Sequence, residues 1–134
     1  MGYTHYWNTK RDFTTEEWTE LQRLAERLFE NYGYLLAGWN GEGEPECDGE
    51  DIRFNGIGHQ SHETMHIHRE RLGKPDWVLQ EDYDRDGEFN FCKTAEKPYD
   101  YVVVQLLRGA KMIAPDAIDL DSDGYVFEDL KERV

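Results

Sequence analysis

Two segments of this chain have the apolar periodicity of amphipathic helices, and they constrain the fold more than any other feature of the sequence. The first covers about residues 14–32. Thr14 and Glu17 at its start have the spacing of a capping box, and Phe13 with Trp18 has that of a hydrophobic staple. We expect Gly33 to end this helix in the left-handed conformation. The predicted buried face consists of Trp18, Leu21, Ala25, Leu28, Phe29 and Tyr32.

The second helix is expected over about residues 98–113. Pro98 suits the first helical position, because its fixed φ angle is helical and its missing N–H would have no partner there. Pro115 cannot continue a helix and closes the segment. The predicted buried stripe consists of Tyr99, Val102, Val103, Leu106, Leu107, Ala110 and Ile113.

Several shorter segments have the composition and alternation of β-strands. These segments are Tyr3–Trp7, Tyr34–Trp39, Asp51–Ile57, Glu63–Arg69, Gly87–Phe91 and Ala117–Leu120. The acidic, glycine-rich residues 41–50 are predicted to form a solvated loop, and Lys74–Asp86 a long loop or flap. We therefore predict an α+β fold of one domain, residues 1–134, in which an antiparallel sheet is packed on one face by the two amphipathic helices.

The composition narrows the function classes. Asp and Glu number 29 against 15 Lys and Arg, and the formal net charge is −14. Because phosphate backbones are bound by clustered basic residues, general nucleic-acid binding is not expected. The chain has no apolar run near the ~18 residues of a membrane helix, and its start does not resemble a signal peptide. These features predict a cytoplasmic protein without membrane contact, in which Cys47 and Cys92 are free thiols. The sequence does not indicate an oligomeric state.

The motif HExxH occurs as HETMH, from His62 to His66. On a helix, two histidines at this spacing can bind zinc while the glutamate activates water. The alternation of Met65 and Ile67 with Thr64, His66 and His68 instead favours a strand. On a strand, His62 and His66 would lie roughly 13 Å apart, too far to bind one ion. The sequence therefore argues against a zinc protease.

The motif DxDxDG occurs twice, at residues 82–87 and 119–124. It corresponds to the first half of a calcium-binding loop. The glutamate that such a loop needs at its twelfth position is replaced by Lys93 in the first copy and by Leu130 in the second. We therefore predict no cofactor and no metal site. The alternative left open is weak calcium binding by Asp119, Asp121 and Asp123.

The segment FCKTAEKPYD, residues 91–100, is the strongest candidate for a binding site. It places basic and hydroxyl side chains before a helix start, where unpaired N–H groups and the helix dipole favour anions. Cys92 within it has no evident base that would make it a nucleophile. We predict a pocket for a small anionic ligand, lined by His5, Asn55, His62, Lys93, Thr94 and Lys97.

Motifs spread along most of the chain resemble a family of small, uncharacterised bacteriophage and bacterial proteins. The shared motifs are GYTHYW near the start, FNGIG at residues 54–58, HET at 62–64, FCKT with KPYD, and SDG at 122–124. In that family the HET segment continues as an extended run without a second histidine, which also argues against zinc. The resemblance implies no particular activity, but it implies a phage setting, in which small accessory proteins counter host defence.

Three functional hypotheses follow. The first is a phage-type accessory protein that binds a small, nucleotide-like anionic ligand and sequesters a signal of host defence. The second is a nucleotide phosphodiesterase or other hydrolase that uses the same pocket, with His5 or His62 as general base and Lys93 stabilising charge. The third is an acidic inhibitor that docks on a basic host protein. The sequence favours binding over catalysis without deciding between them.

Overall fold

The order of helices and strands confirms the predicted α+β class. The structure is a computed structural model that describes residues 3–123. Two short 3₁₀ turns, at Gly33–Leu35 and Gly58–Gln60, accompany the longer elements. In chain order the helices and strands are β1 (Thr4–Thr9), α1 (Thr15–Tyr32), β2 (Leu36–Ala37), β3 (Glu46–Cys47), β4 (Asp51–Gly56), β5 (Met65–His68), α2 (Gln80–Asp86), β6 (Glu88–Lys93), α3 (Asp100–Ile113) and β7 (Ile118–Ser122).

The strands form two antiparallel sheets where the sequence predicted one. In the first sheet β1 is central, and it pairs with β6 along one edge and with β7 along the other. In the second sheet β4 is central and pairs with β2, β3 and β5. The division into two sheets depends on which distant strands pair, and this is information that the alternation within single strands does not contain.

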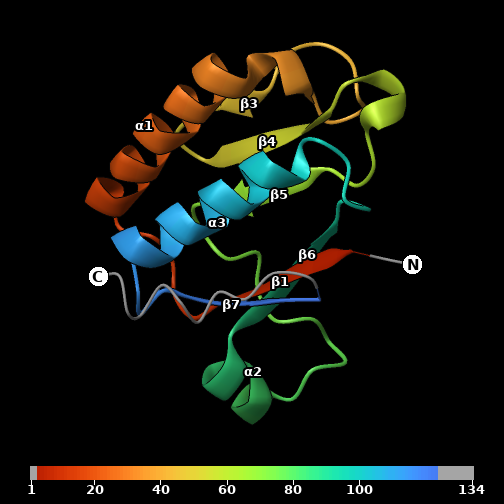
Figure 1. The fold of residues 1–134 in the computed structure, drawn as a ribbon. Helices are drawn as coiled ribbons and strands as arrows, with labels where there is room; N and C mark the ends of the chain where they lie inside the picture. Colours follow the sequence, from red (N-terminus) through yellow and green to blue (C-terminus); the bar gives the residue numbers. More distant parts are fainter. Residues whose placement is uncertain (1–2, 124–134) are drawn as a thin grey trace.

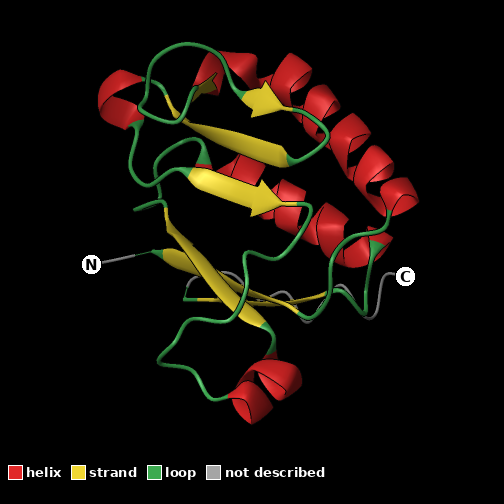
Figure 2. Cartoon of the chain, turned by 180° about the vertical axis from the view of Figure 1, so that it is seen from behind, coloured by secondary structure: helices red, strands yellow, loops and turns green. Residues whose placement is uncertain are grey.

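Helices α1 and α3 pack against each other and lie on one side of the strands. Figure 1 shows α3 in front of β4 and β5, and the view from behind in Figure 2 has these strands in front of the helices. Gly109 of α3 lies at the contact with α1, since a Cβ atom there would be only 2.0 Å from Cδ2 of Leu24. Both helices and both sheets contribute to one buried cluster, whose largest members include Trp18, Tyr99, Phe54, Leu21 and Ile52.

The start of α1 follows the prediction, and its end does not. The Thr14 hydroxyl accepts a hydrogen bond from Glu17 N at 3.1 Å, and Thr14 N donates to Glu17 Oε1 at 2.9 Å. The rings of Phe13 and Trp18 lie 5.7 Å apart, as a staple requires. The left-handed conformation predicted for Gly33 is wrong, because its φ angle is −55° and the chain continues there into a 3₁₀ turn.

Three other boundaries differ from the prediction. Helix α3 begins at Asp100, because Pro98 lies in a turn closed by the hydrogen bond from Asp100 N to Lys97 O. The predicted flap at Lys74–Asp86 ends in helix α2, which buries Tyr83. Within the predicted loop at residues 41–50, β3 pairs with β4. Short pieces of this kind are stabilised by tertiary contacts that their local sequence does not reveal.

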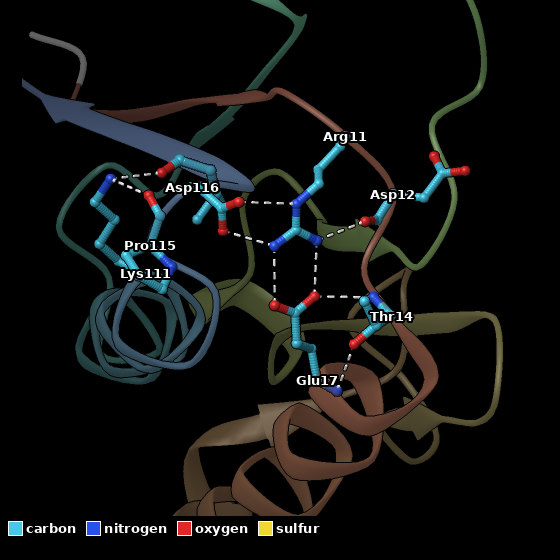
Figure 3. A network of polar contacts seen from close by, with 8 residues as sticks. Arg11, Asp12, Thr14, Glu17, Lys111, Pro115 and Asp116 are labelled. Carbon is cyan, nitrogen blue, oxygen red and sulfur yellow. Dashed lines mark hydrogen bonds and ion pairs between the residues drawn. The ribbon is translucent and has the colours of Figure 1, made fainter.

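Arg11 joins three parts of the fold at one corner (Figure 3). Its guanidinium donates to both carboxylate oxygens of Glu17, at 2.8 and 3.0 Å, and to those of Asp116, at 2.6 and 3.3 Å. These contacts connect the end of β1 to the start of α1 and to the turn between α3 and β7. The hydrogen bonds from Arg11, with those from Thr14, lower the pKa of Glu17 to about 2.

Candidate functional site

The predicted site residues His5 and Thr94 lie together in a buried network around Asp100. His5 Nε2 is 2.6 Å from Asp100 Oδ1, and its Nδ1 is 2.9 Å from Ser122 Oγ. The Thr94 hydroxyl donates to the same Asp100 oxygen. His5 and Thr94 are both fully buried, while the Asp100 side chain is 19% exposed. The network therefore connects β1, β7 and the start of α3 inside the protein.

The groups Ser122, His5 and Asp100 follow one another in the order of a serine-hydrolase triad. The imidazole uses Nε2 toward the aspartate and Nδ1 toward the serine, which is the reverse of the chymotrypsin arrangement. Buried polar side chains are normally hydrogen-bonded, and these contacts satisfy that requirement for the His5 side chain, which is buried on strand β1. We therefore read the network as structural.

Asn55 also uses its side chain to hold the backbone. Its Nδ2 donates to the carbonyl oxygens of Trp39 and His62, at 3.2 and 2.9 Å. Its Oδ1 accepts from Gly56 N at 2.8 Å and from His62 N at 2.9 Å. Asn55 is 2% exposed, so this amide fixes the segment before β5 from within.

The segment after His62 lies against the FCKT segment. Glu63 exchanges two hydrogen bonds with the backbone of Lys93, at 2.8 and 3.1 Å. The carbonyl of Glu63 also accepts from the Tyr99 hydroxyl at 2.6 Å and contacts the Cys92 thiol at 3.5 Å. Burial raises the pKa of Cys92 to about 12, which keeps the thiol protonated. The structure thus brings the two predicted segments together through a carboxylate and backbone groups.

The two lysines of the predicted site lie nearer the surface. Lys93 is exposed on β6, where its Nζ is 6.0 Å from the ring centre of Phe91, and Lys97 is half-buried in the turn before α3. The predicted residues therefore fall into a buried network at His5 and Thr94, a backbone clamp at Asn55 that holds the exposed His62, and two lysines outside both. The pocket predicted from them remains an expectation.

A second group of chemically capable side chains lies on β4 and β5, where the sequence predicted no metal site. In β5, Met65 and Ile67 point into the core and are 0% and 2% exposed. His66 and His68 therefore share the opposite face of the strand, as the alternation of a strand requires. The antiparallel register places Asp51 of β4 directly opposite His68.

The three side chains converge on one carboxylate oxygen. Asp51 Oδ1 is 2.9 Å from His66 Nε2 and 2.9 Å from His68 Nδ1. The two imidazole rings are 3.9 Å apart between centres. Within residues 3–123, this is the group of at least three His, Cys, Asp or Glu side chains whose ligand atoms all lie within 4.8 Å of one another.

The electrostatics of this group favour a carboxylate beside a neutral imidazole. Burial opposes ionisation of Asp51, but the hydrogen bonds from His66 and His68 outweigh it and lower its pKa. Burial lowers the pKa of His66, and the adjacent His68 adds to the effect. A metal ion bound at these nitrogens would displace the protons that form the hydrogen bonds to Asp51, because a proton on the ligand atom competes with the ion.

The group is partly open to solvent. The side chains of Asp51, His66 and His68 are 39%, 31% and 22% exposed. Arg53 lies opposite His66 in the ladder, and its guanidinium pairs with Glu46 at 2.5 Å. Among the described residues the Arg53 Nε atom is buried without a hydrogen-bond partner. The positive charge of Arg53 therefore lies near His66, where it contributes to the lowered pKa of that imidazole.

Neither aspartate repeat forms a comparable group among the described residues. The first copy lies in helix α2 with the turn that follows it, and Asp119 and Asp121 of the second lie on strand β7. A calcium loop needs a tight loop at these positions. Asp119 is also within 3.3 Å of Lys111 Nζ, and Gly124 of the second copy lies outside the described residues.

The sequence contained half of the signal for the Asp51 group. The alternation of β5 placed His66 and His68 on one face of the strand. Two histidines that are two residues apart on a strand are close enough to bind one ion. The missing half is the pairing with β4, which adds Asp51 from 17 residues away.

None of the helices within residues 3–123 has both the length and the apolar character that a membrane-spanning helix requires. Comparison of the chain with protein-family models, with curated proteins and with solved structures gave no match.

Proposed function

We propose that this protein binds a divalent transition-metal ion of the zinc type through Asp51, His66 and His68. The observation that carries the proposal is the convergence of three ligand side chains on the face of β4 and β5, with 2.9 Å between each histidine nitrogen and the Asp51 oxygen. Two ligands of one zinc ion at about 2.1 Å from it lie roughly 3–3.5 Å apart. The side chains are thus close to the separations that a shared ion needs.

The ligand types favour some ions over others. Imidazole nitrogens suit Zn²⁺, Fe²⁺, Co²⁺, Ni²⁺ and Cu²⁺, whereas Ca²⁺ and Mg²⁺ prefer shells of oxygen ligands. Two histidines and one carboxylate are also the protein ligands of known catalytic and oxygen-activating centres. The expected occupant is therefore a transition metal and not calcium.

Three protein ligands leave coordination positions for water or for a ligand. An ion at this group would attract an anionic oxygen. The Arg53 guanidinium, opposite His66 in the ladder and now paired with Glu46, would offer a second contact to that anion. The small anionic ligand expected from the sequence would then be held by the metal and Arg53. In the phage setting that the family resemblance implies, the protein would in this way capture a nucleotide-like signal of host defence.

The alternative, hydrolysis of such a ligand, uses the same ion in another role. A metal-bound water loses a proton near neutral pH and becomes a nucleophile. Incubating the metal-loaded protein with AMP, cyclic AMP and a cyclic dinucleotide separates the two roles. Binding with full recovery of the ligand supports capture, and the appearance of hydrolysis products supports an enzyme.

Metal binding itself is tested by calorimetric titration of the EDTA-treated, dialysed protein with Zn²⁺. The variants His66→Ala and His68→Ala should each weaken binding by at least about tenfold, because each removes one ligand. His59→Ala is the matched control, since His59 is an exposed histidine on a separate turn. Equal affinity in all four proteins would refute the proposal.

Cobalt gives a second, independent readout. Co²⁺ bound by nitrogen and oxygen ligands produces visible absorption bands that report coordination number. These bands should appear at one equivalent in the wild type and in His59→Ala. Their persistence in His66→Ala would place the ion elsewhere in the chain.

A further inference from the structure

The outer face of the sheet β6–β1–β7 carries an arrangement of side chains that the metal group does not use. Along these strands alternate residues point away from the core. The register places Tyr6 of β1 between Phe91 of β6 and Asp121 of β7, and it places Asn8 between Phe89 and Asp119. One side of this face is therefore aromatic and the other acidic.

The aromatic side consists of rings that remain exposed. Phe89 and Phe91 are 58% and 49% exposed. The ring of Phe89 stacks on that of Tyr6, with centres 5.9 Å apart and planes at 28°, and Phe91 lies 5.9 Å from Phe89. Contiguous exposed apolar side chains indicate an interaction surface, whereas single scattered ones do not.

The acidic side supplies charge that is only partly neutralised. Asp119 lies 3.3 Å from Lys111 Nζ and 3.9 Å from Lys10 Nζ. No ion pair within the described part of the chain involves Asp121, whose carboxylate accepts the backbone N–H of Ser122 at 2.8 Å. Asp121 thus presents an exposed carboxylate beside Tyr6.

A hollow joins the two sides. A pocket of about 430 Å³ is lined by Tyr6, Trp7, Asn8, Phe89, Asp119, Leu120 and Asp121. It is therefore bordered by rings from one side of the face and by both β7 carboxylates from the other. An occupant that fits both needs a flat or apolar body with a positive charge.

We propose that this face docks a basic segment of a partner protein, with an arginine side chain in the hollow. A guanidinium can stack on an exposed aromatic ring and pair with a carboxylate at the same time. The chain itself places a cation over this row, since Lys93 Nζ is 6.0 Å from the ring centre of Phe91. A formal net charge of −14 would attract a basic partner over a longer range.

Two other occupants fit the charges less well. Nucleic acid offers bases that could stack on the rings, but its phosphates would meet Asp119 and Asp121. A second copy of this chain would bring the same carboxylates and the same net negative charge to the interface. Charge complementarity therefore selects a basic protein segment, as the hypothesis of an acidic inhibitor also requires.

The test uses fluorescence anisotropy of labelled hexa-arginine and hexa-lysine peptides with the full chain. Hexa-arginine should bind more tightly than hexa-lysine, because only the guanidinium stacks well on rings. Phe89→Ala and Asp121→Asn should each weaken hexa-arginine binding by about tenfold, a loss in the range that one cation–π contact or one charge pair provides.

Matched controls separate this face from general attraction by charge. Trp77→Ala and Asp76→Asn change an exposed aromatic ring and an exposed carboxylate on a different segment, and they should leave binding unchanged. Circular dichroism of each variant verifies folding. If Asp76→Asn weakens binding as much as Asp121→Asn, or if both peptides bind equally, the attraction is nonspecific and the proposal fails.

Sedimentation and a nucleic-acid probe test the two other occupants. A dimer of the wild type that is lost in Phe89→Ala would assign the face to a second copy and overturn the proposal. Tighter binding of labelled oligo-dT than of hexa-arginine would also overturn it. None of these outcomes depends on zinc, so the docking face and the metal group can fail separately.

Discussion

Asp51 and His68 face each other across the β4–β5 ladder, with 2.9 Å between the carboxylate Oδ1 and the imidazole Nδ1. The same oxygen lies 2.9 Å from Nε2 of His66. One carboxylate thus aligns two imidazoles that a strand has already placed side by side. This alignment makes the group a candidate metal centre. Of the other histidines, His5 is hydrogen-bonded inside the protein, and His59 and His62 are exposed.

Zinc should stabilise the folded protein. A ligand that binds only the folded state at 100 times its Kd adds about 2.7 kcal/mol, which corresponds to a rise in Tm on the order of 10 °C. The rise should be seen for the wild type and for His59→Ala by differential scanning fluorimetry. It should fall to about half or less for His66→Ala, since a tenfold higher Kd leaves at most about 1.4 kcal/mol. An equal rise in that variant would show that zinc binds elsewhere.

Replacement of His5 should destabilise the protein. His5→Ala removes a buried imidazole and leaves the Asp100 carboxylate without its imidazole partner, at a cost of about 2–4 kcal/mol. Urea unfolding measures this loss. His62→Ala is the control, because Asn55 holds the backbone of His62, and the cost there should stay within about 0.5 kcal/mol. A small loss for His5→Ala would contradict the structural role of the network.

Acid should remove the stability that the Glu17 carboxylate contributes at the Arg11 corner. The pKa of Glu17 is lowered to about 2 in the folded protein from a usual value of 4.5. A lowered folded-state pKa gives stability that is complete above about pH 4.5 and is lost as the pH falls toward 2. Allowing for solvent screening, we expect about 1 kcal/mol from this carboxylate.

The variant Glu17→Gln isolates this contribution. Its deficit in unfolding free energy relative to the wild type should be present at pH 7 and should shrink toward zero near pH 2. A deficit that stays constant over this interval would show that the carboxylate charge is not what stabilises the corner.

The two thiols should react slowly in the folded protein. Burial raises the pKa of Cys47 to about 11 and that of Cys92 to about 12, so little thiolate is present at pH 8. The reagent DTNB should modify Cys47 first, because Cys92 is fully buried. Both should react at once in 6 M guanidinium. Rapid reaction of Cys92 in the native state would contradict its burial.

A methyl group at Gly109 should push the helices apart. In Gly109→Ala the new Cβ would lie 2.0 Å from Leu24 Cδ2, so overpacking should cost about 1–3 kcal/mol despite the better helix propensity of alanine. Leu24→Ala should recover part of that loss in the double variant. Gly33→Ala is the control, because no atom lies within 4 Å of a Cβ there and the loss should be absent.

The helices could be predicted from sequence because their signals are local. The capping box of Thr14 and Glu17 and the apolar stripe of α3 lie within a few turns of chain, and both are present in the structure. The conformation of Gly33 could not be predicted, since a 3₁₀ turn and a left-handed cap suit the same glycine. The division into two sheets depends on pairing between distant strands.

Prediction of the candidate site was limited in the same way, because its contacts join residues that are distant in the sequence. Counting basic and hydroxyl residues near a helix start identified Thr94, but it could not show that Asp100 already binds both Thr94 and His5. The histidines of β5 were assigned to one face correctly. Only the register with β4 adds Asp51, and that register follows from the burial of Ile52 and Ile67 opposite each other.

The position of Asp51 has a consequence for how the protein opens. Asp51 is the first residue of β4 and His68 the last residue of β5, so their contact fastens the end of the hairpin farthest from its connecting loop. Hairpins fray from that end. The contacts of Asp51 with His66 and His68 thus hold the two strand ends together. The backbone amides at these ends should therefore exchange with deuterium more slowly than strand ends usually do.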